Sequence, residues 1–314
     1  MLYINEKMKK CENAKIPNTF GIDAKAKLFI EYYSLDELRQ VLKEYKGERI
    51  LHIGQGSNLL FTTDFNGVIL HSGMARAKFL DDETVEAQNG LRLDDMIAQL
   101  TDMGYCGLEK LSLIPGEVGA SAVQNVGAYG VEAKDVIERV YTIDVETLEE
   151  RVFSNAECKF GYRDSAFKHE LKGKYIVTSV VYKVKPGDAT KTREEIIATR
   201  NGKLPKVGEV GSAGSFFMNP FVPKEQANAL LAQYPDMPHF PSPQGVKIPA
   251  AWLIEQCGWK GKTLGGAQVW PKQPLVIVNT NNASAQDIID LAAAVSKSVQ
   301  EKFGIDIHPE VNYI

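Results

Sequence analysis

Ser215 has sequence neighbours that would suit a reactive hydroxyl. It lies in the segment GSAGSFFMNP (211–220), between a glycine and two phenylalanines. A hydroxyl with apolar neighbours meets few competing polar groups, so in a pocket it can serve as a proton donor or a nucleophile. The same segment also fits a loop that enters a strand, and by itself it does not decide between the two.

The glycine segment HIGQGSNLLF (52–61) follows an apolar run typical of a strand. Gly54 and Gly56 would let backbone N–H groups approach an anion closely, and Ser57 and Asn58 add side-chain donors. Leu59 stands where a dinucleotide fingerprint has its third glycine, and no Gly-Lys-Ser/Thr follows as in a P-loop. The segment therefore predicts either a phosphate-binding loop or a tight turn.

A second segment of small residues makes the ligand interpretation stronger. GLEKLSLIPGEVGASAVQNVGAYGVE (107–132) contains Gly116, Gly119, Gly127 and Gly130, and it has no clear helical or strand period along its full length. Two such segments can surround a long ligand with a central pyrophosphate, whereas a tight turn needs neither the length nor the glycines. FAD would suit this pair of segments.

Composition indicates an ordinary cytoplasmic protein of two or three subdomains. The chain has 314 residues, of which 44% are hydrophobic and 24% charged, with a net charge of -4. No basic run is present that would neutralise nucleic acid, and no apolar run is long enough for a signal peptide or a membrane span. The four cysteines lie far apart, which favours buried free thiols over a zinc site or a disulfide framework.

Helical and strand patterns alternate along the first half of the chain. Helices are expected at SLDELRQVLKEY (34–45), with Leu35, Leu38, Val41 and Leu42 on one face, and at LRLDDMIAQLTDMG (91–104). The expected strands follow apolar or β-branched runs bounded by turn residues. They are GERILHIG (47–54), FNGVILHSG (65–73), RAKFLDD (76–82) and TVEAQNG (84–90), then a pair within 136–154 that turns near Glu146, and GKYIVTSVVYKVKPG (173–187).

The second half contains more helices. TREEIIATRNGK (192–203) and KEQANALLAQYP (224–235) are expected to be helical, and PDMPHFPSPQG (235–245) is a loop interrupted by proline. In the last helix Ser284 and Asp287 form a capping box. Its apolar face, expected to pack on a core, consists of Ile288, Leu291, Ala292, Val295, Val299 and Phe303. A domain boundary is expected near 205–210.

Seven motifs in order resemble the UDP-N-acetylenolpyruvoylglucosamine reductase family, flavoenzymes that complete the muramic acid unit of bacterial peptidoglycan. The motifs are NTFGIDAKA (18–26), GQGSNLLF (54–61), IPGEVGASAVQNVGAYGVE (114–132), FGYRDSAFK (160–168), GSFFMNP (214–220), AAWLIEQCGWKG (250–261) and HPEVNY (308–313). The resemblance implies an α+β or α/β fold, with a two-lobed FAD-binding domain of the non-Rossmann type and an inserted α/β substrate domain. The implied bounds are 1–66 for the first FAD lobe, 67–205 with 306–314 for the second, and 206–305 for the substrate domain.

The resemblance also implies the reaction and its catalytic residues. Non-covalent FAD would carry hydride from NADPH to the terminal vinyl carbon of an enolpyruvyl UDP-sugar, which leaves an enolate beside a carboxylate. Ser215 matches the residue that protonates the next carbon, with the phenylalanines keeping water away. Arg163 offers a fork that suits the carboxylate, and Glu310 would hold or share a proton near the enolate oxygen. Without the resemblance, Arg163 would be read as the ion-pair partner of Asp164, and Glu310 as a solvated carboxylate.

Further residues are assigned by the same match. The predicted substrate contacts are Lys203, Asn219, Lys260 and Gln273, although surface polar residues are common and Lys203 would also suit a helix end. The predicted FAD contacts are Gly54, Gly56, Ser57, Asn58, Pro115, Gly116, Gly119, Gly127, Tyr129 and Tyr162, for which turn and packing chemistry is the alternative. The resemblance implies a cytoplasmic monomer in cell-wall synthesis, and so a part in cell shape and division, with no nucleic-acid or membrane partner.

The chain departs from the family pattern at three places. One form of the family has a loop with a substrate-closing tyrosine before the helix that ends near 203, whereas VVYKVKPGDATKTREEIIATRNGK passes directly from strand to helix. Phe240 stands where an aromatic hydroxyl is expected, and Met218 replaces a lysine of FFKNP-type relatives. We expect weaker substrate binding, or looser inhibition by excess substrate, with the chemistry retained.

Two other functions fit parts of the sequence. An oxidase of alcohols or lactones could share the flavin fold, but it would not need Ser215, Arg163 and Glu310 together, and its reactivity with oxygen would expose it. A nucleotide-sugar sensor that has lost catalysis would bind ligand without turnover. Retention of all three residue types argues against a sensor.

Overall fold

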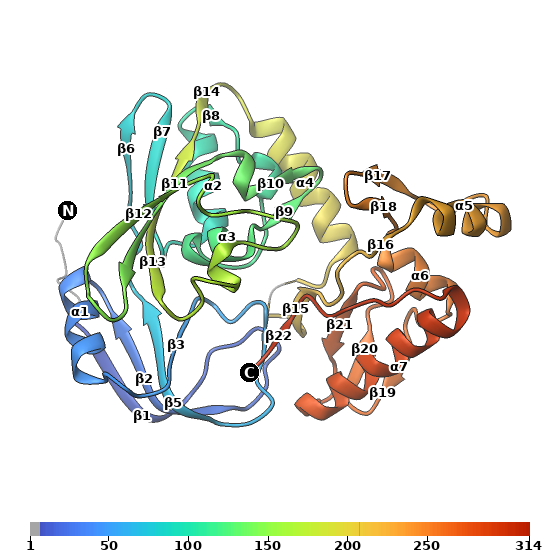
Figure 1. The fold of residues 1–314 in the computed structure, drawn as a ribbon, viewed down its shortest axis with the longest axis horizontal. Coiled ribbons are helices and arrows are strands. Elements are labelled where there is room, and N and C mark those ends of the chain that lie inside the picture. Colours follow the sequence, from blue (N-terminus) through green and yellow to red (C-terminus); the bar gives the residue numbers. More distant parts are fainter. Residues whose placement is uncertain (1–6, 207) are drawn as a thin grey trace. The chain divides into compact units, whose positions relative to one another are not determined.

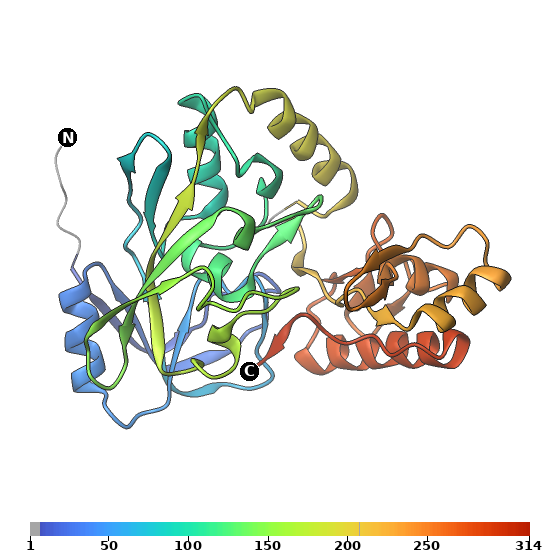
Figure 2. The same cartoon turned by 45° about the horizontal axis from the view of Figure 1, so that its top comes forward.

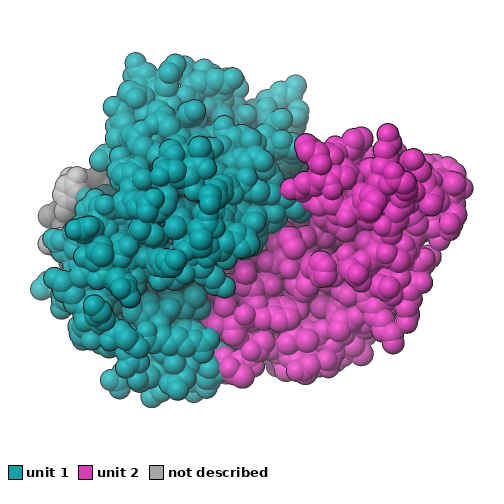
Figure 3. Space-filling model, viewed as in Figure 1, with its two compact units in different colours: residues 1–16, 24–55, 64–200 teal, residues 17–23, 56–63, 201–314 magenta. Residues whose placement is uncertain are grey.

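The structure, a computed structural model, describes residues 7–206 and 208–314. The chain forms two compact units, each assembled from separate stretches of sequence (Figures 1 and 3). Unit 1 contains residues 1–16, 24–55 and 64–200, and unit 2 contains residues 17–23, 56–63 and 201–314. Two short stretches from the N-terminal region therefore belong to the same unit as the C-terminal third.

Unit 1 begins with a four-stranded sheet in the order β1-β2-β5-β3. Strands β2, β5 and β3 run parallel, and β1 pairs antiparallel with β2 at the edge. The bounds are Lys9–Lys15 for β1, Lys25–Tyr32 for β2, Ile50–Ile53 for β3 and Phe65–Ser72 for β5. Strands β3 and β5 were predicted, whereas β1 and β2 were not. The β1 sequence KKCENAK is almost entirely exposed and has no apolar alternation, so it carries no strand signal.

Helix α1 (Leu35–Glu44) packs on this sheet. The Ser34 hydroxyl caps the helix by accepting the Glu37 N–H at 3.2 Å. The helix buries Leu38, Val41 and Leu42 in one cluster with residues of β2 and β5, which confirms the predicted helix and its apolar face.

The second sheet of unit 1 has five antiparallel strands in the order β12-β11-β13-β7-β6. Their bounds are Ala77–Asp81 for β6, Thr84–Gln88 for β7, Ile137–Asp144 for β11, Glu150–Ser154 for β12 and Tyr175–Lys183 for β13. Strand β13 runs through the middle of the sheet (Figures 1 and 2) and is buried from Ile176 to Tyr182. The turn between β11 and β12 falls at the predicted place, where Asp144 accepts the Glu146 and Thr147 N–H groups.

Two helices share a core with this sheet. Helix α2 (Leu93–Asp102) was predicted, whereas α3 (Val118–Gln124) was not. The α3 sequence VGASAVQ consists mostly of small residues and is only two turns long, so it shows no stripe with a helical period. The segment that we expected to be irregular therefore contains a short helix.

Short elements complete unit 1. Strand β8 (Tyr105–Cys106) pairs with β14 (Lys185–Pro186), and β9 (Gly127–Ala128) pairs with β10 (Val131–Glu132). Single 3₁₀ turns lie at Glu109–Leu111, Ala133–Asp135 and Ala166–Lys168. Helix α4 (Thr190–Lys203) starts soon after β14, so no extra loop separates strand from helix, as predicted.

Unit 2 has a four-stranded sheet in the order β15-β21-β20-β19, covered along one face by α7 (Figures 1 and 2). The bounds are Gly211–Ser215 for β15, Thr263–Leu264 for β19, Ala267–Val269 for β20 and Val276–Asn279 for β21. The helices are α5 (Lys224–Gln233), α6 (Ala250–Gln256) and α7 (Ala285–Phe303). Helix α7 has the predicted capping box, and all six residues of its predicted apolar face are buried.

The proline-rich stretch after α5 is more ordered than predicted. It forms β17 (Phe240–Ser242) and β18 (Gly245–Lys247), which join β16 (Phe221–Val222) in a small sheet. Strand β22 (Asn312–Tyr313) pairs in parallel with β4 (Leu59–Leu60), so the last residues lie beside the exit of the first glycine segment. Among the residues described, no helix is both long and apolar enough to span a bilayer.

Candidate active site

In unit 1 the two glycine-rich segments touch each other. Gly54 directly follows β3, and a Cβ atom added to it would lie 3.0 Å from Oε2 of Glu117. The next side chain, Gln55, accepts the Gly116 N–H through Oε1 at 3.1 Å. A larger residue at position 54 would displace the Glu117 side chain, so the absence of a side chain at Gly54 has a packing reason.

The second segment is tightly packed where α3 begins. Gly116 has φ 127, a conformation that favours glycine. The Gly119 N–H donates to the Asn89 carbonyl at 3.0 Å, and a Cβ on Gly119 would lie 2.9 Å from the Cβ of Asn89. The backbone of this segment is therefore seated directly on residue 89, and Pro115 leads into it partly buried.

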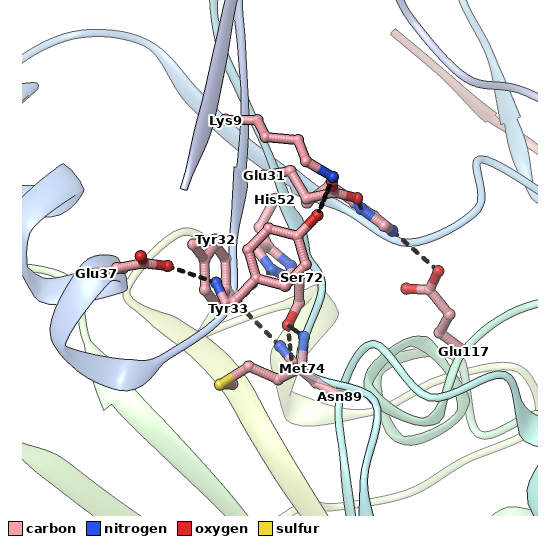
Figure 4. A network of polar contacts seen from close by, with 11 residues as sticks. Lys9, Glu31, Tyr32, Tyr33, Glu37, His52, Ser72, Met74, Asn89 and Glu117 are labelled. Atoms are coloured by element: carbon pink, nitrogen blue, oxygen red, sulfur yellow. Dashed lines mark hydrogen bonds and ion pairs between the residues drawn. The ribbon is translucent and has the colours of Figure 1, made fainter. Parts of the chain in front are cut away.

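Below the segment, buried polar side chains form a connected network (Figure 4). The Ser72 hydroxyl donates to Oδ1 of Asn89 at 2.7 Å, and Nδ2 of Asn89 donates to the Tyr32 hydroxyl at 3.0 Å. Tyr32 in turn lies 2.9 Å from Nε2 of His52. Burial, together with the charge of His71, lowers the pKa of His52 to about 3, so His52 is neutral. The network gives the glycine segment a rigid support.

The loop that carries Tyr162 and Arg163 is attached to the same segment. Arg163 Nη2 donates to the Gly127 carbonyl at 2.6 Å, and its guanidinium carbon lies 5.2 Å from the centroid of the Tyr162 ring. Asn125 Nδ2 donates to the Gly161 carbonyl at 2.6 Å. Asp164, the alternative ion-pair partner of Arg163, pairs with His169 at 2.8 Å.

The backbone of this region is held in uncommon conformations. Arg163 has φ 54 and Tyr129 has φ 53, both in the left-handed region, which costs a non-glycine residue roughly 1–3 kcal/mol. Such residues are concentrated at functional sites, because the surrounding structure must hold them in place. The Tyr129 side chain is 44% exposed at the β9–β10 turn, where an aromatic ring is available to a ligand.

In unit 2 the structure brings Ser215 and Glu310 close along the main chain. Ser215 ends β15, and the next residue, Phe216, donates its N–H to the Leu275 carbonyl at 2.7 Å. The Phe216 carbonyl accepts the Glu310 N–H, also at 2.7 Å. Both Ser215 and Glu310 are partly buried. The segments that carry these two predicted catalytic residues, almost 100 positions apart, are therefore joined by a backbone hydrogen bond from Glu310 to Phe216, the residue after Ser215.

The two phenylalanines after Ser215 belong to the core of unit 2. Phe216 and Phe217 are 0% and 1% exposed, and their ring centroids are 5.1 Å apart. Phe216 also packs against Phe20 and Tyr313. These contacts anchor the strand that carries Ser215, and the expectation that the rings keep water from the serine stays a prediction.

The remaining part of the first glycine segment also lies in unit 2. Gly56 has φ 65, and a Cβ on it would lie 2.4 Å from the Pro17 carbonyl oxygen, so this position requires glycine. Asn58 Nδ2 donates to the Glu310 carbonyl at 3.3 Å, and the Asn58 carbonyl accepts the Asn312 N–H at 3.0 Å. Ser57, between them, is partly buried.

Thr19 provides a test of whether these residues fit a nucleotide cofactor. Its N–H donates to the Gly56 carbonyl at 3.4 Å. Its hydroxyl oxygen is buried. In the part of the chain described, it is the only buried side-chain nitrogen or oxygen atom without a hydrogen-bond partner. A buried hydroxyl without a partner is costly, so a group that bonds it is expected in the working protein. This hydroxyl fits FAD, and no sequence signal beyond the NTFGIDAKA motif pointed to it.

The predicted substrate residues are spread over the surface of unit 2. The carbonyl of Lys203, at the exposed end of α4, accepts the Trp270 Nε1–H at 2.9 Å, and Oδ1 of Asn219 accepts the Ala250 N–H at 2.9 Å. Oε1 of Gln273 accepts the Leu275 N–H at 3.4 Å, near the end of β15. Lys260 is exposed and paired with Glu255 at 2.9 Å, which is what a solvated side chain would also show.

No group of His, Cys, Asp and Glu side chains in the described ranges could hold a metal ion. The polar residues that the sequence analysis missed are Asn89, His71 and Glu117. Glu117 had one visible signal, since it is the single acidic residue in IPGEVGASAVQ, and a buried carboxylate there needs a partner.

Comparisons with known proteins show the family. Residues 206–314 match the UDP-N-acetylenolpyruvoylglucosamine reductase C-terminal domain, and residues 26–147 match an FAD binding domain. A UDP-N-acetylenolpyruvoylglucosamine reductase of Bacteroides fragilis is 48% identical over 95% of this chain and 97% of its own, and one of Neisseria meningitidis is 42% identical over 95% and 94%. The crystal structure of the Thermus caldophilus enzyme of that name has the same fold, with a TM-score of 0.74 at 24% identity over 98% of both chains. The chain thus belongs to the UDP-N-acetylenolpyruvoylglucosamine reductase family.

Proposed function

We propose that this protein reduces the enolpyruvyl group of UDP-N-acetylglucosamine enolpyruvate to give UDP-N-acetylmuramate, with FAD as cofactor and NADPH as hydride donor. The observation that carries the proposal is the 48% identity to a reductase of that name over 95% of the chain. The match to an FAD binding domain supports the cofactor. The reaction belongs to peptidoglycan precursor synthesis, through which it would serve cell shape and division.

When bound, FAD supplies hydride transfer from NADPH to the terminal vinyl carbon. Ser215 then has to protonate the neighbouring carbon. A serine hydroxyl is a weak acid, but an enolate carbon is strongly basic, which makes the transfer less adverse than it would be toward a neutral substrate. This role is supported by the two backbone hydrogen bonds of the next residue, Phe216. They fix the main chain from which the Ser215 side chain extends.

Arg163 and Glu310 are proposed to act on the charge that develops beside the reacting carbon. The guanidinium fork suits the substrate carboxylate, and a preorganised cation stabilises the enolate without rearrangement. Glu310 is proposed to hold or share a proton near the enolate oxygen. The left-handed backbone of Arg163 and the hydrogen bond that its guanidinium donates to the Gly127 carbonyl support a role that requires a fixed orientation.

The other assignments are part of the same proposal. FAD would be held by Gly54, Gly56, Ser57, Asn58, Pro115, Gly116, Gly119, Gly127, Tyr129 and Tyr162, and the UDP-sugar by Lys203, Asn219, Lys260 and Gln273. We further propose that 1–66 and 67–205 with 306–314 form the FAD lobes, that 206–305 bind the substrate, and that the enzyme is a cytoplasmic monomer. Lys260 is the weakest assignment, because its ammonium is already paired with Glu255.

Anaerobic stopped-flow absorbance of the purified protein tests the function. The yellow flavin should bleach on mixing with NADPH and return rapidly when the enolpyruvyl UDP-sugar is added. A protein that cannot take up FAD would contradict the proposal. A flavin that is reduced but is reoxidised only by oxygen would indicate an oxidase, and ligand binding without reoxidation would indicate a sensor.

A further inference from the structure

His71 lies between two carboxylates in unit 1. It belongs to β5, where it is in register with Glu31 of the neighbouring strand β2 and with Ile53 at the end of β3. Its Nδ1 lies 3.1 Å from Oε1 of Glu31, and its Nε2 lies 3.0 Å from Oε1 of Glu117. Figure 4 shows these two glutamates among the polar contacts of this region. The His71 and Glu117 side chains are only 21% and 6% exposed.

This geometry requires a doubly protonated ring. A neutral imidazole carries one N–H and one lone pair, whereas an imidazolium donates from both nitrogens. Ionised carboxylates only accept, so a neutral His71 would place its lone pair against one carboxylate oxygen. Loss of the proton therefore breaks one of the two contacts.

The surrounding groups decide how the charge behaves. Burial by itself would lower the pKa of His71, but the hydrogen bonds and charges of Glu117 and Glu31 outweigh it, and the pKa is raised above the usual 6.5. In the described ranges the other titratable groups nearby are His52, which is neutral, and Tyr32, whose pKa burial raises to about 12. Lys9 and Tyr33 both bond to Oε2 of Glu31. The two-carboxylate contact is thus complete below about pH 6.5 and is lost as the pH rises through the raised pKa.

The two carboxylates do not depend on His71 equally. Glu31 keeps Lys9 and Tyr33 when His71 loses its proton. Among the residues that the structure describes, His71 is the only hydrogen-bond partner of the Glu117 carboxylate. A neutral ring keeps one N–H for Glu117 but no longer carries the charge that compensates this buried carboxylate, so the hold on Glu117 weakens.

Any movement of Glu117 reaches both glycine segments. Its carboxylate lies directly under Gly54, where an added Cβ would be 3.0 Å from Oε2. Its backbone follows Gly116, whose N–H is bonded to Gln55, the residue after Gly54. The His71–Glu117 contact therefore connects the four-stranded sheet of unit 1 to the place where the two segments meet.

We propose that His71 is a positioning residue of the FAD site: in its doubly protonated form it holds Glu117 under Gly54 and so keeps the two glycine segments in the arrangement that binds the cofactor. The proposal rests on the assignment of these segments to FAD. It makes FAD affinity fall with rising pH, because His71 acts on the cofactor site through Glu117. By reciprocity, bound FAD raises the pKa of His71.

The test follows FAD release from the full-length holoenzyme between pH 6 and pH 9. Dilution liberates fluorescent FAD, so the emission gives the dissociation constant at each pH. For the unmodified protein we expect affinity to fall about tenfold across the range, the low end of the effect of losing a hydrogen bond to a charged group. His71→Gln should bind FAD about tenfold more weakly at pH 6 and show no step, again the loss of that one bond. His239→Gln is the matched control, because His239 is exposed and its ring bonds the Met237 carbonyl of its own loop.

Glu117→Gln gives an independent answer if His71→Gln does not fold. It retains an oxygen acceptor but removes the anion, so the step in affinity should move to lower pH. Long-range ¹⁵N NMR of the five histidines should show a higher His71 pKa with FAD than without it. A His71→Gln protein with the original step, an unmoved midpoint in Glu117→Gln, or a His71 pKa that ignores FAD would overturn the proposal. Failure of the unmodified protein to bind FAD at pH 6 would instead reject the proposed function.

Discussion

Replacing Phe216 by alanine separates two roles of the residue that follows the proposed acid. The Phe216 side chain is 0% exposed and packs against Phe20, Phe217 and Tyr313. A buried Phe→Ala change removes the transfer free energy of the ring and leaves a cavity, which together cost about 3–5 kcal/mol. Three neighbouring rings lose an aromatic contact, so we expect about 4 kcal/mol, in the middle of that range.

Urea unfolding followed by tryptophan fluorescence measures this loss of unfolding free energy in unit 2. All three tryptophans, Trp252, Trp259 and Trp270, lie in unit 2, which also holds Phe216. Phe240→Ala is the matched control, because Phe240 is 52% exposed in the same unit and its removal should change the unfolding free energy by at most about 0.5 kcal/mol.

A loss of unfolding free energy below about 1 kcal/mol for Phe216→Ala, or a loss no larger than that of the control, would contradict this prediction. Core truncations of this size cost more than that. In that case Phe216 would not anchor β15, and its role near Ser215 would be to exclude water. A slowed reduction of substrate with unchanged stability would support that alternative.

Three other substitutions and one labelling experiment have distinct outcomes. Ser215→Ala should leave flavin reduction by NADPH near normal and slow reoxidation by substrate about 10²–10⁴-fold in stopped flow, whereas an equal loss in both steps would reject its role as the acid. Gly56→Ala should fold poorly or lose FAD, as judged by the flavin content after purification, because its Cβ would lie 2.4 Å from the Pro17 carbonyl. Ser284→Ala should cost about 1 kcal/mol of unfolding free energy in urea by removing the cap of α7. Cys158 should resist alkylation of the native protein in peptide mass mapping, because burial raises its pKa to about 12.

The helices with strong local signals were predictable. Helices α1 and α7 each combine a serine cap with a stripe of apolar residues, and both appear within a residue or two of the expected bounds. Helix α3 and strand β1 lack such signals, for opposite reasons. Helix α3 is made of small residues packed closely on neighbouring backbone, and β1 is a polar edge strand held by its pairing with β2. Their structure depends on the partner rather than on their own sequence.

The residues of the candidate site also differ in whether the sequence itself identifies them. Ser215, Arg163 and Glu310 stand in motifs that a family resemblance can identify from sequence. Glu31, His71 and Glu117 are separated by 40 and 46 positions, and only the pairing of β2 with β5 and the seating of α3 bring them together. No spacing rule relates a residue near the end of one strand to the residue before a distant helix, so this contact could not be found from the sequence.

At Gly54, a packing role and a ligand-binding role do not exclude each other, although the sequence presented them as alternatives. The alternatives were a tight turn and a phosphate loop, and the Glu117 carboxylate 3.0 Å from the position of an added Cβ gives a packing reason for glycine. A buried anion beneath a loop is unfavourable to a second anion above it unless a cation compensates. The imidazolium of His71 supplies that charge, so the same residue that satisfies Glu117 also makes the loop acceptable to a phosphate-bearing cofactor. On this argument, replacing His71 by a neutral residue should weaken the binding of FAD more than that of riboflavin, which carries no phosphate.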